Sequence, residues 1–147
     1  MFLKTTEYAL RAVIYIAQKG SEEKKLGLSQ IAKAIDSPQS FTAKILQQLT
    51  SGNKIVSSAR GPNGGFYISE KSKNLPVYSI LEAMGEDEIL KKCVLGLKRC
   101  SETNPCPLHH QYKLIKPQLI KMFETKTIKE MADKITSGSS YIGNKKI

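Results

Sequence analysis

Three cysteines lie close together in the sequence and could do chemistry as a group. Cys93, Cys100 and Cys106 fall within 14 residues, and the chain contains no other cysteine. An odd number of cysteines argues against a disulfide framework. Thiolates are soft donors that suit iron–sulfur clusters or zinc. Zinc sites usually contain two cysteines separated by roughly two to four residues, and this stretch has no such pair. We therefore expect an iron–sulfur cluster, with zinc or metal-free redox thiols as alternatives.

Three thiolates leave one ligand position of such a cluster to be filled. A two-iron cluster bound only by protein needs four ligands, and we expect a 2Fe–2S rather than a 4Fe–4S cluster. His109 follows Cys106 by three residues, and His110 comes next. If a helix begins there, the His109 ring could turn towards the thiolates. The alternative is that both histidines are the polar start of a helix.

The charge of the chain favours an anionic partner. The sequence has 23 Lys and Arg against 13 Asp and Glu, a net charge of +10. Residues 24–65 carry six cations, Lys54 among them, and a single acid, Asp36. A basic segment of this kind is typical of nucleic-acid binding.

The elements around this basic segment predict a winged helix-turn-helix. Apolar spacing indicates a helix over 6–19, a short helix over 29–35 with Ser29 as its N-cap, and a longer helix from Pro38 to Gly52. Phe41 is expected on the inner face of the longer helix. Strands over 55–59 and 66–69 then flank a glycine-rich tip, 60–65, which forms the wing. The predicted fold class is mostly α with a small β-hairpin.

Short polar side chains at the start of the longer helix could reach base edges, and the wing tip could enter the minor groove. Arg60 is the guanidinium at that tip, and its glycines would let the backbone approach the duplex. The alternatives are ordinary exposed helix residues and a plain tight hairpin. The predicted DNA-contacting residues are Ser29, Gln39, Ser40, Thr42, Lys44, Ser58, Arg60, Gly61, Asn63 and Gly64.

The second half of the chain predicts a helix over 75–87, the cysteine loop, and a helical region over 108–123. Its apolar residues follow heptad spacing, which predicts a dimerisation helix, and we expect a kink at Pro117. These heptad residues are Leu108, Tyr112, Ile115, Leu119 and Met122. Thr127 and Glu130 form a capping box for a last helix over 127–135. The expected division is a DNA-binding domain over 1–74, the cysteine loop and dimerisation helices over 75–135, and a mobile tail over 136–147.

Other classes of protein fit the sequence less well. No apolar run is long enough to span a membrane, and the N-terminal apolar run contains Glu7 and Arg11 and lacks a cleavage site. We expect a cytoplasmic protein with no membrane partner. No base-oriented nucleophile or pair of carboxylates stands out, so we do not expect an enzyme.

Several stretches together resemble one family. LKTTEYALRAVIYIA, SFTAKILQQL, SSARGPNGGFYIS and LPVYSILEAMGED are similar to the bacterial winged-helix transcriptional regulators typified by IscR, NsrR and CymR. The resemblance implies a homodimer that binds a near-palindromic operator in double-stranded DNA. By position, Ser40 and Arg60 match the family's DNA-contacting residues. Ala43 falls where IscR-type members carry an acidic residue that reads a base, so an IscR-like operator is not implied.

The resemblance also bears on the cysteines. They fall where IscR- and NsrR-type members bind their cluster, although the first gap is one residue longer. The C-P-L-H run ending at His109 resembles the C-x-x-H of IscR-like members, whose histidine is the fourth ligand. Glu7 matches an acidic residue that reaches across the dimer to the cluster in NsrR-like members, and it is the other candidate ligand. Its alternative role is that of an acid favoured at a helix N-terminus.

These observations predict a sequence-specific transcriptional regulator, most simply a repressor. Its operator binding would be controlled by the cluster or its cysteines, in response to nitric oxide, redox state or iron–sulfur status. The alternatives are a metal-free thiol switch on the same fold and a small metal or redox protein.

Overall fold

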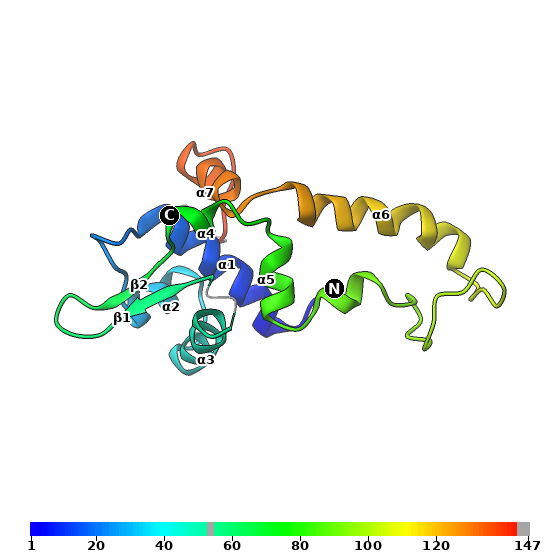
Figure 1. Cartoon of the computed structure of the whole chain (residues 1–147), viewed down its shortest axis with the longest axis horizontal. Coiled ribbons are helices and arrows are strands. Elements are labelled where there is room, and N and C mark those ends of the chain that lie inside the picture. The colour runs from blue at the N-terminus through cyan, green and yellow to red at the C-terminus, as the bar shows by residue number, and fades with distance from the viewer. Residues whose placement is uncertain (53–54, 144–147) are drawn as a thin grey trace.

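A computed structural model describes residues 1–52 and 55–143. Figure 1 shows a helical body with a hairpin projecting from one side and a single helix, α6, projecting from the other. Lys54, counted above in the basic segment, lies outside the described residues. The mostly helical chain with a two-stranded antiparallel hairpin confirms the predicted fold class. The elements in order are α1 (Lys4–Lys19), α2 (Leu28–Ala34), α3 (Gln39–Thr50), β1 (Ser57–Ala59), β2 (Gly65–Tyr67), α4 (Glu70–Lys73), α5 (Tyr78–Ala83), η1 (Asp87–Leu90), α6 (His109–Thr125) and α7 (Ile128–Thr136).

Helix α1 is the centre of the body. Ala9, Ala12, Val13 and Ile16 are completely buried, because apolar residues recur along α1 at helical spacing. Helices α2, α3, α5 and α7 all pack against α1. The core cluster continues from α1 through Ile31, Ile35, Ile45, Leu46, Leu49, Ile55, Val56, Ile68, Ile80, Leu81, Ile128 and Ala132.

The helix-turn-helix is formed by α2 and α3. Between them Asp36 adopts a left-handed conformation with φ 53°, which lets the chain reverse direction within a few residues. The helix was predicted to start at Pro38, but Pro38 is the N-cap residue of α3, which starts one position later at Gln39. The prediction of Ser29 as the N-cap of α2 is wrong, because α2 begins at Leu28 with Gly27 as its N-cap.

The wing is a short hairpin with an additional backbone pairing. The register pairs Ser57 with Tyr67, Ser58 with Phe66 and Ala59 with Gly65, so both strands are shorter than predicted. Leu26, just before α2, pairs with Phe66 through two backbone hydrogen bonds of 2.8 and 2.9 Å. This contact ties the wing to the start of the helix-turn-helix.

The segment after the wing differs from the prediction. Helix α4 was not predicted; Ser69 caps it by accepting a hydrogen bond from the Ser72 backbone at 3.2 Å. The predicted helix over 75–87 is shorter, since α5 ends at Ala83 and the 3-10 helix η1 follows after a turn. The capping box of Thr127 and Glu130 is present at the start of α7 and confirms that prediction.

Helix α6 runs without a break through Pro117 and extends away from the body (Figure 1). Its inner end is fixed by Phe123, whose ring meets that of Phe2 edge to face at 5.6 Å. None of the helices in the described ranges has the length and apolar character needed to cross a bilayer.

The chain returns to the body after α7. Ile142 packs against the core cluster, although we expected a mobile tail from residue 136. The last four residues of that tail, 144–147, lie outside the described residues, and the expected three-part division of the chain stays a prediction.

Candidate nucleic-acid interface and cysteine site

The first turns of α3 present a polar surface. Gln39, Ser40 and Lys44 are exposed, as is Ala43 between them. Ser29 is exposed in the first turn of α2. These predicted contacts therefore lie on the outside of the helix-turn-helix, where short side chains would not hold α3 away from a groove.

Two neighbouring residues on α3 are oriented opposite to the expectation. Thr42 is completely buried, and its hydroxyl is 3.0 Å from both the Pro38 carbonyl and the Ser37 hydroxyl. Thr42 therefore fastens α3 to the preceding turn, and we remove it from the predicted DNA contacts. Phe41, expected inward, is 48% exposed.

The wing tip is a tight turn with Arg60 at its entrance. The Gly64 backbone N–H donates to the Gly61 carbonyl at 2.9 Å, and Gly61 has φ 104°. A Cβ on Gly64 would lie 2.4 Å from the backbone oxygen of Ala59. Position 64 of the tip therefore has no room for a side chain.

Arg60, Asn63 and Ser58 are all exposed on this hairpin. None of the ion pairs within residues 1–52 and 55–143 involves Arg60. The guanidinium is thus positioned by the backbone of the hairpin, not by a carboxylate partner.

The cysteine loop joins η1 to α6 at the outer end of α6 (Figure 1). Cys93 and Cys106 are buried and Cys100 is exposed; all three are free thiols. Hydrogen bonds from the backbone of Leu95 and Leu97, together with one involving the Cys106 side chain, lower the pKa of Cys93 below its usual value. Cys93 and Cys106 therefore form one neighbouring pair of sulfur donors.

His109 and Cys100 form a second pair of donors. The His109 ring is only 4% exposed, and its Nδ1 lies 3.3 Å from the Cys100 Sγ. Its Nε2 is buried and has no hydrogen-bond partner within the described part of the chain. The helix expected to begin near His109 does begin there.

Glu102 is the residue of this site that the sequence analysis missed. Its Oε1 lies 3.6 Å from the His109 Nε2, and it pairs with Lys113. The hydrogen bond from Lys113 holds the pKa of Glu102 below its usual value, so the carboxylate facing the imidazole is charged. The position of Glu102 between Cys100 and Cys106 was the sequence feature that could have indicated this residue.

The donors remain two pairs. Among residues 1–52 and 55–143, no three His, Cys, Asp or Glu side chains are grouped so that they could hold a metal ion. The kinds of donor nevertheless fit an iron–sulfur group, since three thiols lie in one loop and the buried His109 imidazole begins the helix that follows it.

Glu7 lies elsewhere. It is on α1 in the body, where its carboxylate is 3.6 Å from the Lys4 ammonium and 44% of its side chain is exposed. A contact of Glu7 with a second copy of the chain stays a prediction.

A helix-turn-helix with an adjacent arginine-tipped wing defines a winged-helix DNA-binding protein. The chain matches the model of the Rrf2 family, described as iron-dependent transcriptional regulators, over residues 2–134. It belongs to the Rrf2 family, which confirms the resemblance found in the sequence and places the chain among transcriptional regulators rather than enzymes.

Individual relatives agree with this assignment. A protein of Aquifex aeolicus named as an HTH-type transcriptional regulator is 32% identical over 133 residues, covering 89% of this chain and 90% of that protein. The structure of CymR, the global cysteine regulator of B. subtilis, has a TM-score of 0.70 and 17% identity, covering 90% of this chain and 96% of that one. T. potens IscR has a TM-score of 0.70 and 15% identity, covering 97% and 93%. At these identities the two structures show the shared fold.

Proposed function

We propose that the protein is a homodimeric repressor that places α3 in the major groove of a near-palindromic operator and the wing in the adjacent minor groove. The supporting observation is the wing itself. Gly64 occupies a position of the tip that has no room for a side chain, and Arg60 lies exposed at the entrance of the tip. The minor groove is about 6 Å wide, and its negative potential attracts guanidinium.

The dimer is supported by the uncovered face of α6. Leu114, Ile115 and Met122 are 71%, 51% and 50% exposed. A single helix projecting from the body with such residues on its surface would expose them to water in a monomer. A second α6 packed along the predicted heptad face would cover Ile115 and Met122.

We infer that Cys93, Cys100, Cys106 and His109 would hold an iron–sulfur cluster. When bound, such a cluster supplies a centre whose integrity and charge respond to nitric oxide, oxidants and iron supply. A residue of the chain orients one of the ligands of this cluster. Glu102 faces the Nε2 side of the His109 ring and leaves Nδ1 towards Cys100, as carboxylates commonly orient ligating histidines.

The test of the cluster proposal begins with the iron and acid-labile sulfide content of protein purified without air. Substitution of His109 by Ala is then compared with Glu7→Ala. We expect loss of bound iron in His109→Ala and retention in Glu7→Ala. His110→Ala is the matched control, because His110 is the adjacent residue and is exposed. Iron loss in Glu7→Ala alone would instead assign the fourth ligand to α1 of a second copy.

A metal-free thiol switch is the second candidate, and the same site supports it. The exposed Cys100 thiol lies beside an imidazole that in turn faces a carboxylate, so a nucleophile lies next to a base that a third group orients. Hydrogen peroxide would accept two electrons from the Cys100 sulfur, giving a sulfenic acid at Cys100 and releasing water. Protein that lacks iron and sulfide, yet loses DNA affinity reversibly with peroxide and only when Cys100 is present, would favour this candidate.

A further inference from the structure

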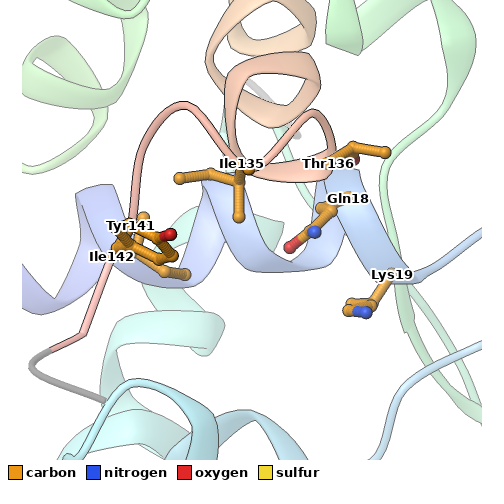
Figure 2. Close-up of a pocket in the computed structure, with 7 residues that line it drawn as sticks. Gln18, Lys19, Ile135, Thr136, Tyr141 and Ile142 are labelled. Carbon is orange, nitrogen blue, oxygen red and sulfur yellow. The ribbon is translucent and has the colours of Figure 1, made fainter. Parts of the chain in front are cut away.

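A cavity of about 290 Å³ lies between the C-terminal ends of α1 and α7. Figure 2 shows Gln18 of α1 and Ile135 of α7 facing the same space, with Tyr141 and Ile142 on one side and Lys19 on the other. Ligand pockets span about 300–1,000 Å³, so this cavity is at the small end and suits a metabolite. It lies on the body, whereas the cysteine loop lies at the outer end of α6 (Figure 1).

The polar centre of the cavity is an acceptor that lacks a donor. The Gln18 Oε1 atom is buried and has no hydrogen-bond partner in the described structure. A buried polar atom without a partner costs about 1–3 kcal/mol, so a ligand whose donor reached this oxygen would stabilise the protein.

The electrostatic field of the cavity favours a cationic donor. Helix α1 ends at Lys19 and helix α7 ends at Thr136, and both residues line the cavity. The C-terminal end of a helix carries a partial negative charge, about half an elementary charge, although residues 137–140 already donate to the Asp133, Lys134 and Ile135 carbonyls of α7. The two helix dipoles and the Gln18 oxygen favour an ammonium group over a neutral donor.

The two sides of the cavity define the rest of the ligand. Lys19 is exposed and can pair with a carboxylate at the mouth. Ile135, Ile142 and the Tyr141 ring provide an apolar surface on the other side. We propose that this cavity binds an aliphatic α-amino acid, with its ammonium on Gln18, its carboxylate on Lys19 and its side chain against Ile135, Tyr141 and Ile142.

The tail residues that close the cavity also reach the helix-turn-helix. Tyr141 and Ile142 line a second cavity of about 450 Å³ together with Arg11 and Asp36. Asp36 is the left-handed residue of the turn before α3, and the Arg11 guanidinium donates to the adjacent Ile35 carbonyl at 3.0 Å. An occupied cavity would hold residues 141 and 142 against α1 and so support this turn. The proposal does not depend on the iron–sulfur proposal, because none of its residues belongs to the cysteine loop.

The test is calorimetric titration of the full-length protein with L-leucine, with isoamylamine, which lacks the carboxylate, and with isocaproate, which lacks the ammonium. We expect L-leucine to bind most tightly, isoamylamine more weakly and isocaproate not measurably. Gln18→Leu keeps the size of the side chain and removes the acceptor, so both amines should bind at least about tenfold more weakly. Lys19→Gln should weaken the binding of L-leucine and leave the binding of isoamylamine unchanged.

Lys24→Gln is the matched control, since Lys24 is an exposed lysine outside the cavity; it should bind all three compounds like the unaltered protein. A thermal-unfolding series with L-valine, L-methionine and L-glutamate checks the side-chain preference, with stabilisation expected for the first two. Absence of heat and of thermal stabilisation with every amino acid would mean that the cavity holds water alone and would overturn the proposal. Binding that is unaffected by Gln18→Leu would overturn it as well.

Discussion

Removal of the wing guanidinium is the most direct test of how the protein meets DNA. Arg60 is exposed at the entrance of the turn that Gly61 and Gly64 close. The register of the hairpin is fixed by three residue pairs, none of which includes Arg60. Arg60→Ala should therefore leave the fold and its thermal stability unchanged and act only on DNA.

The expected size of the effect follows from the number of charges removed. Each neutralised phosphate contributes about 0.9 to the slope of log affinity against log salt concentration. A homodimer loses two guanidinium groups, so the slope should become shallower by about 1.8. Between about 50 and about 200 mM salt, the affinity of the variant should then fall about twelvefold less than that of the unaltered protein.

The assay is fluorescence anisotropy on a duplex that the unaltered protein has selected from random-sequence DNA. Lys129→Ala is the matched control, because Lys129 is an exposed cation on α7, on the side of the body away from α3 in Figure 1. Its salt slope should equal that of the unaltered protein. An unchanged slope in a stable Arg60→Ala protein would refute the placement of the wing on the duplex.

Three further variants test other parts of the structure. Thr42→Val removes the hydroxyl that bonds Ser37 and Pro38. It should lower the free energy of unfolding, measured in urea, by about 1–3 kcal/mol, whereas Ser40→Ala, at an exposed position, should leave it unchanged. Equal unfolding midpoints for the two variants would contradict the anchoring role of Thr42. The double change of Ile115 and Met122 to Asp should give monomers on a sizing column, with Gln118→Asp, exposed on α6, as the control that stays dimeric. Gly64→Ala brings a Cβ to 2.4 Å from a backbone oxygen and should abolish tight DNA binding. Gly27→Ala is the control, because a Cβ at position 27 meets nothing within 4 Å, and this variant should bind DNA normally. Intact binding by Gly64→Ala would show that position 64 of the wing tolerates a side chain.

Patterns carried by neighbouring residues along the chain were sufficient to predict most of the fold. The apolar spacing of residues 9–17 predicted α1, and most of its apolar residues do line the core, whereas Leu10 and Ile14 are half-buried. The capping box at Thr127 is a local hydrogen-bond pattern, so it could be read directly from residue types. The pairing of Leu26 with Phe66 could not be predicted from residue types, because it joins residues forty positions apart by backbone atoms alone.

The direction of two side chains on α3 is a second feature that the sequence did not predict. Hydrophobicity assigns Phe41 to the core and Thr42 to the surface, yet the structure reverses them. The Thr42 hydroxyl is satisfied by the turn before the helix, so its burial leaves no unpaired polar atom. In the cysteine loop the sequence predicted the donors, but their division into two pairs depends on backbone conformation that no periodicity describes.

Helix α6 extends from the body and can act as a lever (Figure 1). Its 17 residues span about 25 Å, with the cysteine loop at the tip and the Phe2–Phe123 contact at the pivot. A tilt of about 5° over such a rod displaces its tip by about 2 Å, and conversely a small shift at the tip turns the body through an angle. Because Phe2, next to the start of α1, meets α6 at that pivot, the proposed chemistry at the thiols would change the direction in which α2 and α3 face without any rearrangement inside them.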